Sequence, residues 1–518
     1  MSGKVMMVQG TASHVGKSVL VSAFCRIFRQ DGFRVAPFKA QNMSNNSYVT
    51  ADGLEIGRAQ AVQADAAGVE ARVEMNPILL KPEADHISQV VVMGRPLLTA
   101  KARDYFGLKP QLWEAVHTSL DSLREDFDIV VVEGAGSPAE INLKKNEIVN
   151  MRVARYADAP VLLCGDIDRG GVFAFLVGTL ELLEPEEREL IKGFVINKFR
   201  GDPSLLTDGI TWLEERTGIP VAGLVHYYRD IHIPEEDSVA LDVAPVSTPK
   251  SVLDVAVLQL PHIANFDDFD PLARHPGVDL RYVDSPEQLG RPDLVIIPGT
   301  KTTIPDLAWM NERGLSQAVQ DLHAGGAAVL GICGGYQMLG TKVSDPEHIE
   351  SSLTELDGLG LLDLTTIFEG SKETHRISGK VTGGTGLLAG AAGVPVTGYE
   401  IHMGRTSRTM GEGISSAFRI EDRADAPVSS SGDSEGAIDA SGSVMGTYIH
   451  GLFHNGELRS AMLKELARRK GVSLPDTANV LDLDREYDKL ADWVRASMDM
   501  DLIYRMSGLS RDYDAAKV

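Results

Sequence analysis

The sequence predicts an α/β protein made of two doubly wound domains, each built on a parallel β-sheet. Short apolar runs alternate with helical patterns in both halves of the chain, as expected for buried parallel strands connected by helices. A glycine-rich loop follows the first apolar run, and a cysteine on a glycine turn follows another run in the second half. The 518 residues also exceed what one hydrophobic core usually supports, so two or more domains are expected.

The first half predicts a series of strands with ligand-binding loops at their carboxyl ends. The expected strands are residues 5–8, 34–37, 129–132, 161–163 and 194–196, most of which end in glycine or a polar residue. A helical pattern from Ser18 to Gln30 connects the first two, which makes a βαβ unit.

A linker is expected where the first series of strands ends. The stretch Asp242–Ser251 contains Pro245 and Pro249 among small polar residues. Beyond it we expect strands at 255–258, 294–297, 327–332 and 444–449, and a helical tail at 481–509. Residues 411–440, rich in Ser, Gly, Asp and Glu, are expected to form an exposed loop or an insertion. The predicted domains are therefore 1–245, 252–458 and a C-terminal helical extension, 459–518, that packs on one of them.

The composition excludes some classes of function. A formal net charge of −23 argues against a nucleic-acid-binding protein, which would normally carry a basic face. No apolar run approaches the length of a membrane span and no signal-peptide core follows Met1, so we expect a cytoplasmic protein that is not embedded in a membrane. The three cysteines, Cys25, Cys164 and Cys333, show no metal-ligand spacing and suit a reducing compartment.

Residues 10–18 (GTASHVGKS) predict a phosphate-binding loop. Gly10 and Gly16 let backbone N–H groups approach phosphate oxygens, Lys17 neutralises those oxygens, and Ser18 offers a hydroxyl to Mg²⁺. Five residues separate the two glycines, where four are usual. The order of strand, loop, GKS and helix nevertheless indicates a nucleoside triphosphate site, and we expect ATP there.

Two further strands of the first half end in polar residues. Glu133 follows the run at 129–132, where a carboxylate beside the phosphate loop is well placed to hold Mg²⁺ together with Ser18. Considered alone, a solvated acid at a turn is the alternative. Asn197 follows the run at 194–196 and is a candidate to contact the base of the nucleotide, although an ordinary turn residue fits nearly as well.

Two segments dense in polar groups are candidate substrate contacts. Residues 39–46 (KAQNMSNN) follow the second strand, and residues 76–82 (NPILLKP) lie between two prolines. Lys39 and Lys81 are suited to carboxylates or phosphates, with surface lysines in loops as the alternative. The candidate substrate-binding residues are Lys39, Gln41, Asn42 and Lys81.

The second half carries a candidate thiol nucleophile. Cys333 lies between the run 327–332 and a helical pattern, so its sulfur is expected at a helix N-terminus, which favours the thiolate. His450, at the end of another strand, is the candidate base, with His402 and His454 as competitors. Backbone N–H groups of Gly299 and Gly334 are the candidates to stabilise an oxyanion.

Several of these motifs resemble known families. GTASHVGKS with VEGAG resembles the dethiobiotin-synthetase-like ATP-binding fold, a variant of the P-loop NTPases. GICGGYQMLG with YIHGLF resembles a flavodoxin-like class I glutamine amidotransferase domain. The segments APFKAQNMSNNSY, MNPILLKP, IPGTKTTIPDLAWM and GYEIHMGRT, together with the tail YDKLADWVRASMDMD, resemble the cobyric acid synthase family over nearly the whole chain.

The resemblance implies a glutamine-hydrolysing carbon–nitrogen ligase. Such enzymes use ATP, Mg²⁺ and glutamine to amidate the b, d, e and g carboxylates of the corrinoid adenosylcobyrinic acid a,c-diamide, giving adenosylcobyric acid in cobalamin biosynthesis. The alternatives are a related amidotransferase acting on the a and c positions or on a cell-wall lipid, and a non-catalytic ATPase switch. Leu452 stands where many class I amidotransferases have a glutamate, so the orienting partner of His450 is open, with Glu400 or no partner as possibilities.

Overall fold

The computed structural model describes residues 2–84, 86–228, 231–234, 251–408, 413–424, 426–475 and 482–510. The chain forms two compact units. The first contains the residues up to Ser44, Ile56–Pro234 and the described residues from Asp482 on; the second contains Asn45–Glu55 and the described residues between 251 and 475. All but the last residue of the predicted linker, 242–251, lie outside the described residues.

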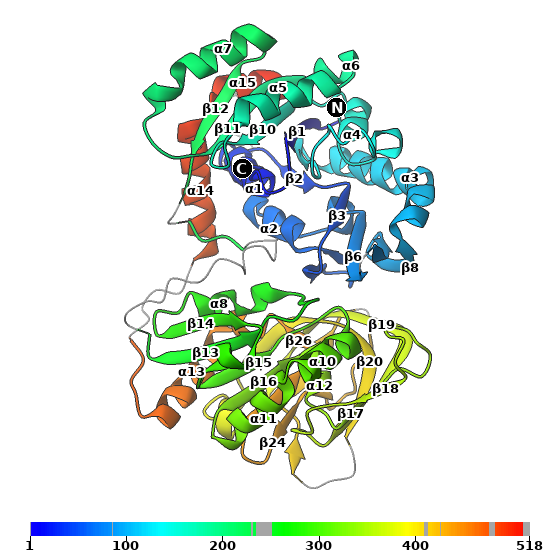
Figure 1. Ribbon diagram of the computed structural model, residues 1–518, viewed down its shortest axis with the longest axis vertical. Coiled ribbons are helices and arrows are strands. Elements are labelled where there is room, and N and C mark those ends of the chain that lie inside the picture. Colours follow the sequence, from blue (N-terminus) through cyan, green and yellow to red (C-terminus); the bar gives the residue numbers. More distant parts are fainter. Residues whose placement is uncertain are drawn as a thin grey trace. The chain divides into compact units, whose positions relative to one another are not determined.

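The first unit is built on a six-stranded sheet in which every neighbouring pair is parallel (Figure 1). Its order is β12 (Val221–His226), β11 (Ile191–Phe199), β10 (Val161–Asp166), β1 (Lys4–Gly10), β9 (Ile129–Glu133) and β2 (Val35–Phe38). The strands are almost entirely buried, since their apolar side chains are covered on both faces. The predicted parallel sheet of this half is therefore confirmed.

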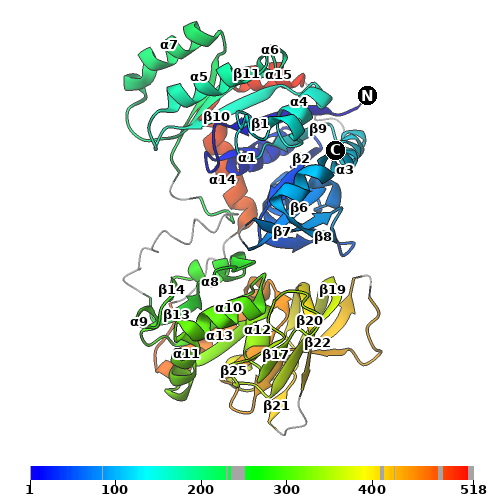
Figure 2. The ribbon, with the colours of Figure 1, turned by 45° about the vertical axis from the view of Figure 1, so that its right-hand side comes forward.

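The helices of the first unit connect these strands. They are α1 (Lys17–Gln30), α2 (Arg58–Ala67), α3 (Ala102–Asp126), α4 (Met151–Ala157), α5 (Val172–Leu182), α6 (Pro185–Arg188) and α7 (Thr207–Thr217). A small second sheet, β3 (Gln41–Met43), β6 (Ile78–Ala84), β7 (Ile87–Val92) and β8 (Arg95–Lys101), packs beside α3 (Figure 2). This sheet presents the two polar segments that the sequence singled out.

The C-terminal tail completes the first unit. Its two helices, α14 (Leu483–Ser497) and α15 (Met500–Ser507), contribute apolar side chains to the same core as α1. Arg26 on α1 is nearly buried and pairs with Asp484 at 2.8 Å and Asp488 at 2.7 Å on α14. The apolar spacing of the tail thus reflects a face that packs against α1 of the first unit.

The second unit contains a mostly parallel sheet. Its order is β14 (Val278–Val283), β13 (Leu253–Leu258), β15 (Leu294–Ile297), β16 (Ala328–Ile332), β25 (Val444–Thr447), β24 (Ala437–Asp439) and β21 (Ile414–Ser415), with only the last two pairings antiparallel. Its helices are α8 (Asp270–Ala273), α9 (Pro286–Leu289), α10 (Thr303–Glu312), α11 (Leu315–Ala324), α12 (Gly334–Met338) and α13 (Gly456–Lys470). The predicted fold class is confirmed here as well.

A second, mixed sheet of this unit was not predicted. It runs β18 (Glu355–Asp357), β17 (Lys342–Ser344), β19 (Leu364–Val381), β20 (Pro395–Arg408) and β26 (Ile449–His450). A further strand, β22 (Phe418–Arg423), pairs with β19, and β23 (Asp433–Glu435) pairs with β22. The expectation of an exposed loop at 411–440 is therefore wrong for the residues that form β22 and β23. Phe418 and Ile420 alternate with exposed Arg419 and Glu421, a period-two pattern that the polar composition obscured.

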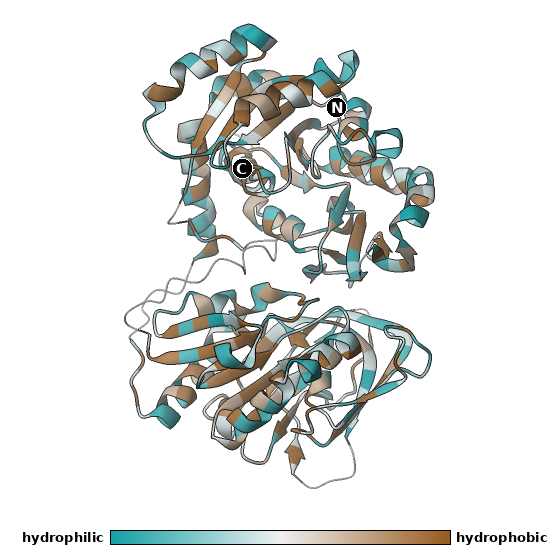
Figure 3. Cartoon of the chain, in the orientation of Figure 1, coloured by the Kyte–Doolittle hydropathy of each residue, from teal (hydrophilic) through white to brown (hydrophobic). Residues whose placement is uncertain are grey.

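Hydropathy follows this architecture. Figure 3 shows brown, hydrophobic strands inside each unit and teal residues on the outer sides of the helices. Within the described part of the chain, no helix is long and apolar enough to cross a membrane.

Candidate active sites

The phosphate-binding loop lies between β1 and α1, as predicted. Gly16 has φ 99°, a left-handed conformation that favours glycine. A side chain at Gly10 would place its Cβ only 2.6 Å from Val15 Cγ2 and 2.9 Å from the Ala12 carbonyl oxygen. Lys17 Nζ donates hydrogen bonds to the carbonyl oxygens of Ala12 (2.9 Å) and Gly136 (3.2 Å), so its ammonium lies over the loop.

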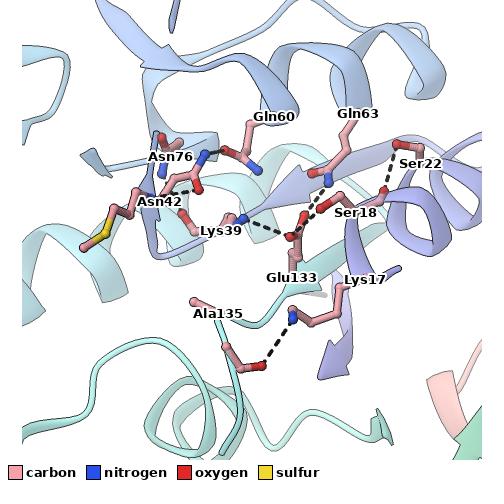
Figure 4. A network of polar contacts seen from close by, with 12 residues as sticks. Lys17, Ser18, Ser22, Lys39, Asn42, Gln60, Gln63, Asn76, Glu133 and Ala135 are labelled. Atoms are coloured by element: carbon pink, nitrogen blue, oxygen red, sulfur yellow. Dashed lines mark hydrogen bonds and ion pairs between the residues drawn. The ribbon is translucent and has the colours of Figure 1, made fainter. Parts of the chain in front are cut away.

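Glu133 is the centre of a buried polar network beside this loop (Figure 4). Its Oε1 accepts hydrogen bonds from Ser18 Oγ at 2.8 Å and Lys39 Nζ at 2.9 Å, and its Oε2 accepts one from Gln63 Nε2 at 2.5 Å. Burial by itself would raise the pKa of Glu133, but the Lys39 ammonium, the hydrogen bonds and Lys17 hold it below its ordinary value. A charged carboxylate is therefore kept against the Ser18 hydroxyl.

The other candidate nucleotide contact lies against the loop itself. Asn197 Nδ2 donates to the Val15 carbonyl oxygen at 2.8 Å, which fastens the end of β11 to the phosphate-binding loop. The next residue, Lys198, donates to the His14 carbonyl oxygen at 2.6 Å and pairs with Asp166 at 2.9 Å. In this geometry the Asn197 side chain is hydrogen-bonded to the backbone of the phosphate-binding loop.

The four candidate substrate residues lie on or beside the small sheet. Lys39, Asn42 and Lys81 are buried, not loop residues on the surface. Asn42 Nδ2 donates to Gln60 Oε1 at 3.2 Å, and Gln41 Oε1 accepts from the Tyr105 hydroxyl at 2.5 Å. Of the four, Lys39 reaches the Glu133 network directly (Figure 4).

Cys333 occupies a sharp turn between β16 and α12. Its φ of 52° and ψ of −110° are a strained conformation for a residue with a side chain, and such strain is typical of presented nucleophiles. The turn needs small neighbours: a Cβ at Gly335 would lie 2.0 Å from the Ile297 carbonyl oxygen, and one at Gly331 would lie 2.6 Å from the Gly335 carbonyl oxygen. The Cys333 thiol is buried and donates to the Ile401 carbonyl oxygen at 3.3 Å.

His450 faces this thiol and is oriented by Asp268. Its Nδ1 lies 2.7 Å from Asp268 Oδ2, and the Gly451 N–H donates to Asp268 Oδ1 at 2.7 Å. Burial opposes the charged imidazole, but the Asp268 carboxylate and a hydrogen bond with Cys333 outweigh it and raise the pKa of His450 to about 10. Cys333, His450 and Asp268 thus form a nucleophile–base–orienter set.

The competing residues have other partners. The His402 ring stacks on Tyr448 with centroids 3.7 Å apart, and burial lowers its pKa to about 4. His454 Nε2 lies 3.4 Å from the backbone oxygen of Asp267. Glu400, the acid considered as the orienter of His450, instead pairs with Arg423 at 3.1 Å.

The two candidate oxyanion glycines lie at the same site. A Cβ at Gly299 would be 3.0 Å from His450 Cε1 and 3.6 Å from Cys333 Cβ, so this backbone borders both reacting groups. A Cβ at Gly334 would be 2.8 Å from Thr300 Cγ2 in the same loop. Close by, a cavity of about 420 Å³ is lined by residues that include His402, Tyr448, Arg405, Arg408, Arg423 and Glu435.

Comparison with known proteins agrees with this pairing of sites. A family model described as the CobQ/CobB/MinD/ParA nucleotide binding domain matches residues 6–239, and one described as the CobB/CobQ-like glutamine amidotransferase domain matches residues 254–458. The cobyric acid synthase of Dehalococcoides mccartyi (strain CBDB1) is 55% identical over 502 residues, which are 97% of this chain and 98% of that protein.

The chain belongs to the cobyric acid synthase family.

Other members agree. The cobyric acid synthase of Pelotomaculum thermopropionicum is 54% identical over 98% of this chain and 97% of its own length, and that of Sorangium cellulosum is 50% identical over 99% and 100%. The family assignment drawn from the motifs is therefore confirmed, and so is the presence of a nucleotide-binding half.

Sequence reasoning missed two residues of these sites. Asp268 lies in the run FDDFD, where nothing in the spacing indicates which acid turns toward His450. Gln63 lies in a helical pattern of alanines and glutamines, and only the fold brings it to Glu133. Both are polar residues whose burial only the fold reveals, so the sequence carries no signal that singles them out.

Proposed function

We propose that this protein amidates the b, d, e and g carboxylates of adenosylcobyrinic acid a,c-diamide, using glutamine as the nitrogen donor and ATP as the energy source, to give adenosylcobyric acid. The observation that carries the proposal is that one chain, similar over 97% of its length to a cobyric acid synthase, holds both a phosphate-binding loop and a Cys–His–Asp set. The first supports carboxylate activation and the second supports ammonia release.

Ammonia release would begin at Cys333. The thiol gives its proton to His450, and the sulfur attacks the side-chain amide carbon of glutamine. Backbone N–H groups of Gly299 and Gly334 are the proposed donors to the oxyanion. His450 returns the proton to the amide nitrogen of the tetrahedral species, which collapses to a thioester and ammonia; water then hydrolyses the thioester to glutamate and restores the thiol.

Asp268 contributes by fixing the imidazole. Its carboxylate accepts from Nδ1, so the other ring nitrogen is directed at the thiol, and its charge stabilises the imidazolium that forms. The cavity of about 420 Å³ next to His402 is the proposed glutamine site, since arginine and glutamate side chains suit an α-carboxylate and an α-ammonium.

The first unit would activate the acceptor. ATP would place its phosphates against the loop at residues 10–18, where Lys17 balances the charge of the transferring phosphoryl group. The acceptor carboxylate attacks that group to form an acyl phosphate and ADP, and ammonia then displaces phosphate to leave the amide. Lys39, Gln41, Asn42 and Lys81 are the proposed contacts to the acceptor.

The residues at Glu133 fit a magnesium ion. A hydroxyl and a charged carboxylate lie 2.8 Å apart at the mouth of the loop, and Mg²⁺ uses one or two such protein oxygens together with phosphate oxygens and water. Ser18 and Glu133 would hold the ion, which when bound neutralises phosphate charge. The free thiols of Cys25, Cys164 and Cys333 favour a reducing location, which we propose to be the cytoplasm.

Product mass tests the proposal directly. The purified protein is incubated with adenosylcobyrinic acid a,c-diamide, ATP, Mg²⁺ and glutamine, and the corrinoid is followed by mass spectrometry. We expect four successive carboxyl-to-carboxamide conversions, each dependent on ATP. An unchanged corrinoid in the presence of active glutamine hydrolysis would point to another acceptor.

A further inference from the structure

A short arm of the chain belongs to the second unit although the residues on both sides of it belong to the first. This bridging arm is Asn45–Glu55 and contains β4 (Ser47–Val49). It closes on itself, because Thr50 N donates to the Leu54 carbonyl oxygen at 2.8 Å and Leu54 N donates to Thr50 Oγ1 at 3.1 Å. The arm therefore has a defined shape of its own.

The arm contacts the turn that carries Asp268. Ser47 N donates to Asn265 Oδ1 at 2.8 Å, and Phe266 N donates to Asn46 Oδ1 at 3.4 Å. Asn265 starts this turn in a left-handed conformation with φ 52°, and its carbonyl oxygen accepts from Asp268 N at 3.1 Å. The arm thus holds the first two residues of the turn that carries Asp268.

The arm also contacts the residue that packs on His450. The Tyr399 hydroxyl donates to the Ser47 carbonyl oxygen at 3.3 Å, and the Tyr399 ring stacks on the His450 ring with centroids 5.3 Å apart and planes 17° apart. The Tyr48 ring meets the edge of Tyr399 at 5.9 Å. The arm therefore contacts two neighbours of the Asp268–His450 pair. These are Asn265, in the turn that carries Asp268, and Tyr399, which stacks on His450.

The arm is fastened to β19 at Tyr48 and at its last residue, Glu55. Lys372 forms an ion pair with Glu55, and both side chains are almost fully buried. Arg376 Nη2 donates to the Tyr48 hydroxyl at 2.8 Å. A buried ion pair is costly to break, so the arm is held in register on the sheet that carries Tyr399.

We propose that the bridging arm positions the Asp268–His450 pair, so that Asn265 and Tyr399 are positioning residues for glutamine hydrolysis. This inference rests on the proposed function and deepens it by naming how the glutaminase site is regulated. Before Asn45 the chain forms β3, with the proposed acceptor contacts Gln41 and Asn42; after Glu55 it enters α2, which carries Gln63 of the Glu133 network. Ligand binding at the first site can therefore act along the chain on the arm and, through the hydrogen bonds of the arm to Asn265 and Tyr399, on the surroundings of His450.

Two variants of the full-length protein each remove one of the hydrogen bonds that link the arm to Asn265 and to Tyr399. Asn265→Gly removes the acceptor of Ser47 N while keeping a residue that tolerates the left-handed backbone, and Tyr399→Phe removes the hydroxyl but keeps the ring on His450. Each should lower kcat/KM for glutamine hydrolysis about fivefold, the equivalent of about 1 kcal/mol per hydrogen bond, and leave amidation with ammonium chloride unchanged. Asp52→Asn is the control, because Asp52 is exposed on the same arm and bonds to Thr50.

The pH profile separates positioning from a merely structural role. Among the described residues, the charged or titratable groups that face His450 are Asp268, Cys333, His402 and the Tyr399 phenol. A less well placed Asp268 lets the pKa of His450 fall, so the alkaline limb of kcat/KM should move to lower pH in both variants and stay in place in Asp52→Asn. A uniform loss with an unmoved limb, or wild-type kinetics, would overturn the inference.

Coupling to the first site is measured in the same preparations. The rate of glutamine hydrolysis with ATP, Mg²⁺ and acceptor, divided by the rate without them, should exceed one in the wild type and fall toward one in Asn265→Gly. A ratio of one in the wild type would overturn the inference that ligands at the first site regulate glutamine hydrolysis. Absence of any glutamine hydrolysis in the wild type would instead count against the proposed function, so the two failures are distinguishable.

Discussion

The orienting carboxylate Asp268 offers the sharpest test of the glutaminase site. In Asp268→Asn, the amide oxygen can still accept from the Gly451 N–H, while the amide nitrogen faces His450 Nδ1 and donates to it. The imidazole then carries its proton on the nitrogen that should accept from Cys333, which is the wrong tautomer for a base. The fold is retained because the side chain keeps its size and one of its two hydrogen bonds.

The magnitude follows from the bond that is lost. A hydrogen bond to a charged group contributes about 1.5–3 kcal/mol, which corresponds to a fall of about 10- to 150-fold in kcat/KM for glutamine. The pKa of His450, about 10 in the folded protein against an ordinary 6.5, should fall toward the ordinary value. The stability that this group contributes is complete below about pH 6.5 and is lost as the pH rises through 10, and the variant should lack this dependence.

The assay is glutamate formation between pH 6 and 10.5, with thermal unfolding over the same range. The matched control is Asp270→Asn, which removes a carboxylate from the same acidic run, where it pairs with Arg274 at 3.1 Å. Amidation with ammonium chloride should be normal in both variants. Equal glutaminase kinetics in Asp268→Asn and Asp270→Asn would refute the assignment of Asp268.

Two further predictions concern the first unit. Lys17→Ala should abolish amidation with either nitrogen source, because Lys17 balances the charge of the transferring phosphoryl group. Glutamine hydrolysis at Cys333 should persist in this variant. Near-normal amidation would show that the phosphate-binding loop takes no part in the reaction. Glu133→Gln should abolish ATP-dependent amidation at all Mg²⁺ concentrations and also destabilise the fold by about 3 kcal/mol, because it removes the buried negative charge that pairs with the Lys39 ammonium. Since the pKa of Glu133 lies below its ordinary 4.5, the wild-type contribution is present above that pH and is lost on acidification. In chemical denaturation, Lys39→Met combined with Glu133→Gln should recover stability without recovering amidation; a double variant as unstable as the single one would contradict the pairing argument.

Much of the fold could be predicted because parallel sheets bury whole strands. The strands β1, β9, β10 and β16 carry almost continuous apolar runs, which stand out in a sequence whatever surrounds them. The mixed sheet was missed because its long strands β19 and β20 are half exposed and rich in charged residues. The burial of such strands is set by their partners and not by their own composition.

The residues of the candidate sites also fall into two groups: those that a local sequence pattern reveals and those whose role depends on distant parts of the chain. Lys17, Ser18 and Cys333 lie in short segments where local backbone geometry dictates glycine neighbours, so the sequence itself reveals them. Asp268 and Gln63 act across the fold, on His450 and Glu133, from segments remote in sequence. Their roles depend on which strands become neighbours, and a single sequence carries no direct record of that pairing.

The division of labour between the two sites is the central claim, and Cys333→Ser tests it most directly. The variant is given adenosylcobyrinic acid a,c-diamide, ATP and Mg²⁺, once with glutamine and once with a high concentration of ammonium chloride, and product mass is followed. The account predicts no amidation with glutamine and wild-type amidation with ammonia, since the thiol serves only to release ammonia. A folded variant that fails with both nitrogen sources, or that works with both, would contradict it.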